Sequence, residues 1–141
     1  MSVLPPLEEE FVASGRLQLR VQPIAILGAA SELAAQAAEC AGEQEGFWEY
    51  SDAVFAGLAA GELAISPEGL KGLAEGRVGD EAAFASCLDS GRYAAAVRAA
   101  TVEARSAGIR SVPATFVNGE KVPASLDALR SAILAELAGG R

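Results

Sequence analysis

Histidine is absent from the 141 residues of this chain. Its imidazole is the commonest general base and the commonest metal ligand, and it belongs to most serine and cysteine hydrolase triads. Most hydrolase mechanisms are therefore disfavoured. The glycines between positions 69 and 79 do not follow a strand and lack the lysine of a P-loop, so phosphate binding has little support. We expect neither a metal nor another cofactor.

Cysteine is scarce, because Cys40 and Cys87 are the two in the chain. They lie 47 positions apart, which is too far for a local zinc site or a Cys-x-x-Cys redox motif. The sequence leaves two interpretations open. The pair forms a disulfide bond, or both residues are reduced thiols that are buried as small hydrophobic side chains.

Basic residues are also few, with 11 against 19 acidic residues and a formal net charge of -8. This charge opposes the counterion release that drives nucleic-acid binding, so we expect no nucleic-acid partner. No apolar run reaches the roughly 18 residues that a membrane span needs. Residues 1–10 have neither the basic nor the apolar region of a signal peptide. We therefore expect one soluble domain without its own secretion signal.

What the sequence does contain is a mixture of helix and strand patterns. A helix is expected to begin near Pro5 and Pro6, since proline suits a first helical turn, or to be kinked there after an earlier start, and Gly15 should end it. Apolar and polar residues then alternate from Leu17 to Val21, which predicts a strand with one buried face.

A block of helices is predicted from Ser31 to about Ala85, with Ser31 as the N-cap of the first. Ser66-Pro67 and Asp80 are typical starts of two shorter helices, and Cys40 and Cys87 fall on inward faces. The helix after Gly46 has a broad apolar stripe that we predict to be core: Phe47, Trp48, Val54, Phe55 and Leu58.

The C-terminal part changes character after a longer helix from about Arg92 to Ala107. Two short β-rich runs, Ala114 to Val117 and Glu120 to Val122, are joined by Asn118-Gly119, the strongest local signal for a type I′ hairpin. A last helix is predicted from about Ser125 until Gly139 and Gly140, and one face of it is apolar: Leu126, Leu129, Ile133, Leu134 and Leu137.

The most specific motif is Ser111-Val112-Pro113-Ala114-Thr115-Phe116-Val117-Asn118-Gly119. A cis peptide costs least before proline, yet only about 5 to 6% of such bonds in folded proteins are cis. A trans proline at the start of an edge strand is the alternative. The sequence does not decide between the two isomers.

Three separated stretches, residues 38–44 with 47–50, 87–93 and 108–119, resemble the DsbA-like family of thiol-disulfide oxidoreductases, and the resemblance spans nearly the whole chain. The resemblance implies an α/β (α+β) thioredoxin-like fold with an inserted helical domain. Residues 1–28 and 108–141 would be the thioredoxin core and residues 29–107, approximately, the insert, all within one domain of residues 1–141.

The resemblance also implies roles for particular residues. Val112 and Pro113 would border the substrate site, with Pro113 in the cis form. Cys40 and Cys87 would form a second, structural cysteine pair as in some family members. The family's first core strand and its Cys-x-x-Cys motif would precede Met1, so no residue inherits a catalytic role and we expect the chain as given to be redox-inactive. The remaining strands should close up, or a partner should supply a strand through dimerisation or domain swapping.

Three functions follow from this resemblance. The first is disulfide exchange with cysteine-containing protein or peptide substrates, outside the cytoplasm in the periplasm or after secretion, where disulfides persist. The second is a non-catalytic thioredoxin-like module for protein binding or assembly. The third is a glutathione-dependent isomerase or transferase of the DsbA-like group.

Overall fold

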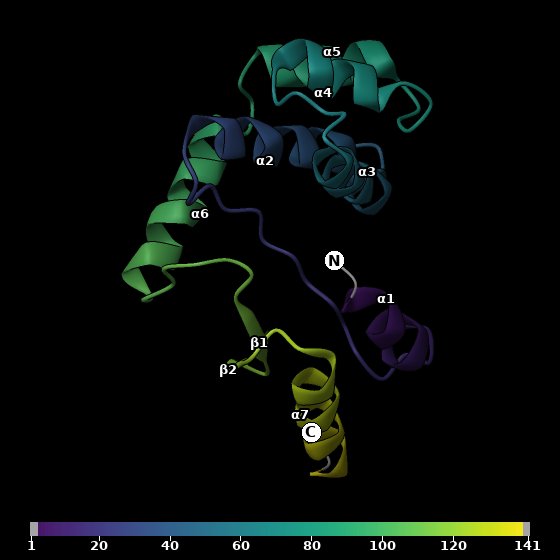
Figure 1. The fold of residues 1–141 in the computed structure, drawn as a ribbon, viewed down its shortest axis with the longest axis vertical. Coiled ribbons are helices and arrows are strands. Elements are labelled where there is room, and N and C mark those ends of the chain that lie inside the picture. The colour runs from purple at the N-terminus through teal and green to yellow at the C-terminus, as the bar shows by residue number, and fades with distance from the viewer. Residues whose placement is uncertain (1–2, 140–141) are drawn as a thin grey trace. The chain divides into compact units, whose positions relative to one another are not determined.

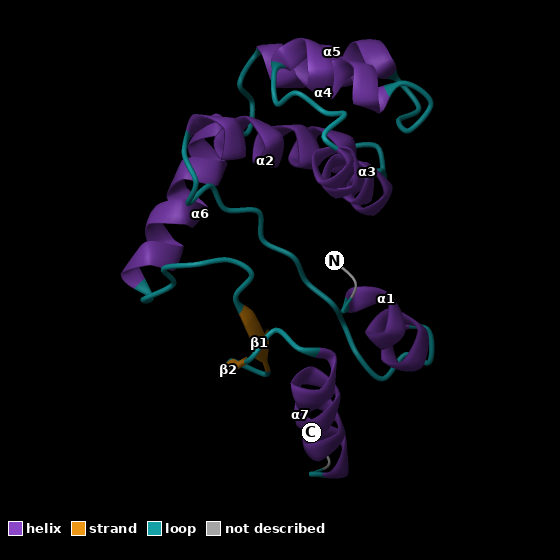
Figure 2. Cartoon of the chain, viewed as in Figure 1, coloured by secondary structure: helices purple, strands orange, loops and turns teal. Residues whose placement is uncertain are grey.

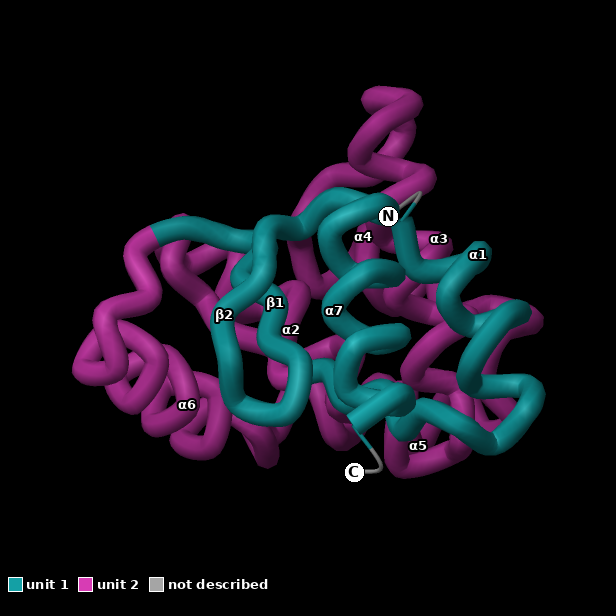
Figure 3. Tube along the Cα trace, turned by 90° about the horizontal axis from the view of Figure 1, so that it is seen from below, with its two compact units in different colours: residues 1–21, 111–141 teal, residues 22–110 magenta. Residues whose placement is uncertain are grey.

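A computed structural model describes residues 3–139 as a mostly helical chain with one small sheet (Figures 1 and 2). Contacts divide the chain into two compact units, which Figure 3 colours separately. Unit 1 comprises residues 1–21 and 111–141, and unit 2 comprises residues 22–110. The elements in chain order are α1 (Leu4–Leu7), a π-helical turn η1 (Glu8–Val12), α2 (Ala29–Gly42), α3 (Phe47–Ala60), α4 (Pro67–Ala74), α5 (Glu81–Asp89), α6 (Ala94–Ser106), β1 (Thr115–Val117), β2 (Glu120–Val122) and α7 (Leu126–Ala138).

Unit 1 is built around the packing of α1 and η1 with α7. Phe11 on η1 is completely buried and packs with Leu7, Leu129 and Ile133. An ion pair of 2.8 Å between Arg130 Nε and Glu10 Oε2 also joins η1 to α7. The described part of unit 1 thus has a small core with four buried residues.

The N-terminal helical segment begins and ends as predicted. Pro5 and Pro6 occupy its first turn, where a missing amide hydrogen costs nothing because it has no partner within a helix. After η1 the chain turns at Gly15, whose φ of +76° is readily adopted by glycine.

The sheet of unit 1 is the predicted hairpin. β1 pairs with β2 in antiparallel register, with Thr115 opposite Val122 and Val117 opposite Glu120. Asn118 and Gly119 form the two-residue loop with φ values of +47° and +86°, and two positive values are what a type I′ turn requires. The alternation of the pair leaves Val117 and Val122 against the core and Phe116 exposed.

The predicted strand from Leu17 to Val21 is wrong, because these residues are not assigned to any strand. Their alternation persists in the burial from Leu17 to Arg20, where the leucines are partly buried and the polar residues exposed, but it ends at Val21, which is 42% exposed. A strand also needs a hydrogen-bonded neighbour, and within residues 3–139 the sheet contains β1 and β2 alone. The strands therefore do not close up, and the supply of a strand by a partner stays a prediction.

Unit 2 packs α3, α4, α5 and α6 around α2. Its largest buried side chains include Tyr50 and Phe84, whose rings lie 5.2 Å apart. The Tyr50 hydroxyl donates a 2.9 Å hydrogen bond to the Leu70 carbonyl, and burial raises the pKa of Tyr50. Buried Thr101 is satisfied as well, because its Oγ1 donates to the Val97 carbonyl and accepts from the Ala25 amide. The buried hydroxyl groups of Tyr50 and Thr101 therefore both have hydrogen-bond partners in the interior of unit 2.

The helix starts predicted from capping residues are correct with one exception. Ser66, Asp80 and Ser125 each accept a hydrogen bond from the amide three residues later. Ser31 was expected to do the same for α2, but that helix begins at Ala29. Gly28 occupies the N-cap with a φ of +101°, which glycine adopts readily. The first helical residue is therefore Ala29, two positions before Ser31.

The predicted core of α3 is partly wrong. Val54 is buried, whereas Trp48, Phe55 and Leu58 are 42%, 51% and 46% exposed. The apolar residues of α3 cover more of its circumference than its neighbours α2 and α4 bury. Leu134 of α7 is exposed for the same reason, and Gly140, predicted to help to end α7, lies outside the described residues.

Candidate functional site

The open end of the hairpin carries a hollow of about 330 Å³ in unit 1. One side of it is the segment Pro113 to Thr115 that leads into β1, and the other is Lys121 to Ala124 at the end of β2. The Val112–Pro113 peptide bond at its entrance is cis. Pro113 thus lines the hollow, and Val112, 45% exposed, precedes it.

The lining of this hollow is suited to binding rather than to chemistry. It is mainly apolar, and Lys121 is its one charged residue. The Thr115 hydroxyl donates to the Val122 carbonyl across the strand pair, so it has a partner already. None of the lining residues is a thiol, so the hollow holds no sulfur for disulfide exchange, and its reactive side-chain groups are the Lys121 amine and the Thr115 hydroxyl.

The segment of residues 111–114, which leads into the hollow, contains main-chain amides without a backbone partner. Within residues 3–139, the amides of Ser111, Val112 and Ala114 make no hydrogen bond to another backbone group. An extended peptide can satisfy such groups by lying alongside them like an added strand. The hollow thus combines apolar side chains with nearby main-chain amides that have no backbone partner.

The Lys121–Ala124 side of the site was not anticipated from the sequence. The signal for it was present, since an Asn118-Gly119 hairpin places Val122 opposite Thr115 and so brings Pro123 back towards Pro113. The register of this hairpin therefore identifies both walls of the hollow.

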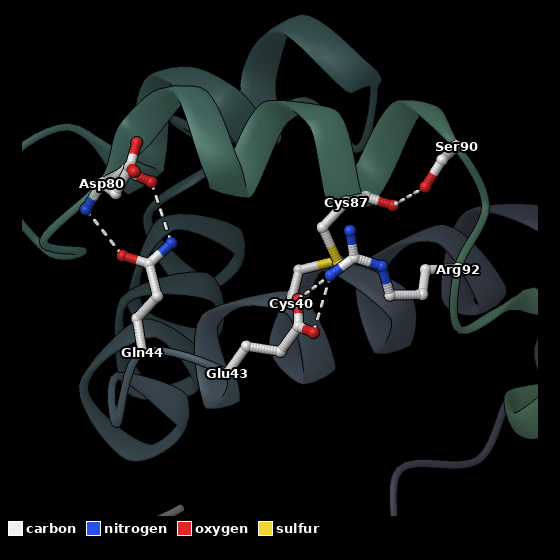
Figure 4. Close-up of a disulfide and its surroundings, with 7 residues drawn as sticks. All are labelled: Cys40, Glu43, Gln44, Asp80, Cys87, Ser90 and Arg92. Carbon is white, nitrogen blue, oxygen red and sulfur yellow. Dashed lines mark hydrogen bonds and ion pairs between the residues drawn. A yellow bond between two sulfur atoms is a disulfide. The ribbon is translucent and has the colours of Figure 1, made fainter.

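Both cysteines lie in unit 2, where they form a disulfide between α2 and α5 (Figure 4). The Cys40–Cys87 bond has a Cα–Cα distance of 5.8 Å. Each cysteine is 1% exposed. The alternative of two reduced thiols is therefore wrong.

Polar contacts on both sides hold the helices that carry this disulfide. Arg92 Nη1 donates to both carboxylate oxygens of Glu43 at 2.6 and 2.7 Å, and this hydrogen bonding lowers the pKa of Glu43. Gln44 donates to the Asp80 carbonyl at 2.8 Å and accepts from the Asp80 amide (Figure 4). A reactive cysteine needs an accessible sulfur, and this pair has none, so its place in the structure is that of a cross-link.

Two further observations concern residues 3–139 alone. In that part of the chain no three histidine, cysteine or acidic side chains gather as a metal ligand set would. None of its helices has the length and apolar character needed to cross a bilayer.

Nearly the whole sequence is similar to one known protein family. A model of the thioredoxin family matches residues 1–135, which is nearly the whole chain. The chain belongs to the thioredoxin family. The α/β thioredoxin-like fold expected from the sequence is thereby confirmed, with a predominantly helical content and a small sheet.

A curated relative supports the DsbA-like resemblance within that family. The chain is 28% identical over 142 residues to "Probable disulfide bond formation protein D" of Bacillus anthracis. The alignment covers 97% of this chain but 65% of the relative, so the chain spans about two thirds of that protein's length. No solved structure matches the chain significantly.

Proposed function

We propose that residues 1–141 form the substrate-binding part of a DsbA-like thiol-disulfide oxidoreductase. The match to the thioredoxin family and the name of the Bacillus anthracis relative support this assignment. The observation that carries it is the hollow at Pro113, with free amides along one side. An enzyme that exchanges disulfides in proteins must hold an extended cysteine-containing segment of its substrate beside its own reactive sulfur.

In this proposal the substrate lies against Val112 and Pro113. Their exposed apolar atoms contact the residues that flank the substrate cysteine, and the free amides at Ser111 and Ala114 hydrogen-bond its backbone. Exchange requires a thiolate that attacks one sulfur of a disulfide, forms a mixed disulfide and displaces the other sulfur as a thiolate. The attacking cysteine would be supplied by a segment outside these residues, because Cys40 and Cys87 are bonded to each other.

The proposed place of action is outside the cytoplasm. Disulfides persist in the periplasm and in secreted proteins and are rare in the cytosol. The buried Cys40–Cys87 bond supports an oxidising compartment for this chain, and disulfide exchange is an activity of the same compartments.

Peptide titration followed by NMR tests the proposed site. The ligand is an extended peptide with one alkylated cysteine flanked by apolar residues, and the expected amide shifts are confined to residues 111–124. Val112→Asp should weaken binding by about tenfold or more, because it sets a charge against an apolar ligand. Val102→Asp is the matched control, since Val102 is an exposed valine of unit 2, at 61%. Equal affinity in both variants would contradict the proposal.

A non-catalytic binding module is the second candidate, and the disulfide favours it, because the two cysteines of these 141 residues leave no free thiol. Both candidates predict peptide binding and no insulin reduction by the chain alone. The reading frame upstream of the Met1 codon separates them. An in-frame strand followed by Cys-x-x-Cys supports the oxidoreductase, and its absence supports the binding module.

A further inference from the structure

Helix α3 has a second apolar face that unit 2 leaves exposed. Tyr50 and Val54 form its buried face. Trp48, Phe55 and Leu58 are each more than two fifths exposed, and their spacing of seven and three residues places them on one side of the helix. We call these three residues the α3 stripe. Three large side chains over about 15 Å of helix are a larger apolar surface than single exposed residues, which are common.

Acidic residues dominate the sequence around the α3 stripe. Between Arg20 and Lys71 the sequence contains eight acidic residues and no basic residue. Four exposed carboxylates lie on α3 or within two residues of its ends, and in residues 3–139 none of them takes part in an ion pair: Glu45, Glu49, Asp52 and Glu62. An apolar strip bordered by unpaired negative charges selects partners by charge as well as by hydrophobicity.

We propose that the α3 stripe binds a basic amphipathic helix of a partner protein. The apolar side of such a helix would cover Trp48, Phe55 and Leu58, and its lysine or arginine residues would approach Glu49 and Asp52. A second copy of the same face is disfavoured, because a two-fold arrangement sets like charges against each other. This inference is independent of the hollow at Pro113, which belongs to unit 1.

The chain contains its own reporter for this interaction. Trp48 is the one tryptophan, so the intrinsic emission of the protein reports on the stripe. The probe is a synthetic helical peptide with leucine on one face and lysine on the other, and its analogue with glutamate in place of lysine is the comparison. The lysine peptide should cause a saturable blue shift that weakens as salt rises from about 0.05 to about 0.5 M. The glutamate peptide should cause none.

Two sets of variants make the test specific. Phe55→Ser with Leu58→Ser keeps the reporter and should weaken binding by about tenfold or more, while Val102→Ser, at another exposed apolar residue of unit 2, should not change it. Glu49→Lys with Asp52→Lys, at two exposed positions, should exchange the preference so that the glutamate peptide binds and the lysine peptide does not.

Three results would overturn the proposal. They are equal binding by the serine double variant and the Val102 control, an unchanged peptide preference after charge reversal, and a blue shift that appears with protein concentration alone. The last result would mean that a second copy of the chain occupies the stripe.

Discussion

The two units differ in how much holds them together. Unit 2 is one continuous segment, residues 22–110, whose main core contains eleven buried residues and a disulfide. Unit 1 combines residues 1–21 and 111–141, and its described part has a core of four buried residues. The hollow lies on the less constrained unit. Ligand-binding segments are commonly drawn from regions of lower local stability, which agrees with the binding role that we propose for this hollow.

Removing the central ring of unit 1 should break that unit while unit 2 remains folded. Phe11→Ala deletes a completely buried side chain and should cost roughly 3 to 5 kcal/mol, a large loss for a core with three other buried residues. Hydrogen exchange read by mass spectrometry should show fast exchange in residues 3–16 and 115–138 and protection in α2 to α5. Phe116→Ala, at an exposed ring of the same unit, is the control and should leave exchange unchanged. Loss of protection in both units would contradict the comparison.

Removing the disulfide should test whether this cross-link accounts for the greater stability that we expect of unit 2. Closing a loop of 47 residues stabilises a fold by on the order of 4 kcal/mol in the chain-entropy model, so Cys40→Ala with Cys87→Ala should lower the unfolding free energy of unit 2 by up to that amount. Urea unfolding with and without reductant measures the change.

Reductant should leave the unfolding free energy of the double alanine variant unchanged, whereas it should lower the unfolding free energy of the unsubstituted chain. An alkylating reagent should label no thiol in the denatured, unreduced natural chain and two after reduction. Labelling before reduction would show that the bond is incomplete.

The caps of two helices allow a matched comparison between the units at a smaller scale. The Ser125 hydroxyl accepts from the Ala128 amide in unit 1, and the Ser66 hydroxyl accepts from the Gly69 amide in unit 2. Replacing either serine with alanine should cost about 1 kcal/mol in thermal or urea unfolding of its own unit. Ser131→Ala, at an exposed position inside α7, should be neutral or slightly stabilising, because alanine favours helix interiors. A loss equal to that of Ser125→Ala would reject capping as the cause.

The smallest expected effect is a pH dependence in unit 2. The hydrogen bond from Arg92 lowers the pKa of Glu43 below its ordinary value of 4.5. The pair therefore stabilises the fold above pH 4.5, and this contribution is lost as the pH falls through the lowered pKa. Arg92→Ala should flatten the stability profile below about pH 4.5. The raised pKa of Glu39, which burial causes, acts in the opposite direction in both proteins and cancels in the comparison. Identical profiles would contradict the assignment.

Much of the fold could be predicted because its signals are local. A cap at Ser66 or Asp80 depends on the amide three residues later, and the turn at Asn118-Gly119 depends on two backbone conformations. Neither requires knowledge of the rest of the chain. The family motif around Pro113 is equally local, so it indicated one wall of the hollow.

The errors arose where the structure depends on distant segments. Alternation from Leu17 to Val21 is the pattern of a strand, but a ladder forms between two strands and the pattern describes one. Trp48 and Phe55 match the apolar pattern of a core, but burial depends on which helices pack against α3. The α3 stripe could therefore be recognised after the elements were placed and not before, whereas the second wall of the hollow follows from the local hairpin register.

The division of the chain also orders events on the ribosome. Unit 2 is complete once residue 110 has emerged, whereas residues 1–21 must wait for residues 111–141 before their unit exists. Both cysteines belong to the segment that is completed first, so oxidation of the pair can precede the synthesis of residues 111–141. During that interval Phe11 has no α7 to cover it, and the nascent chain exposes an aromatic ring to chaperones.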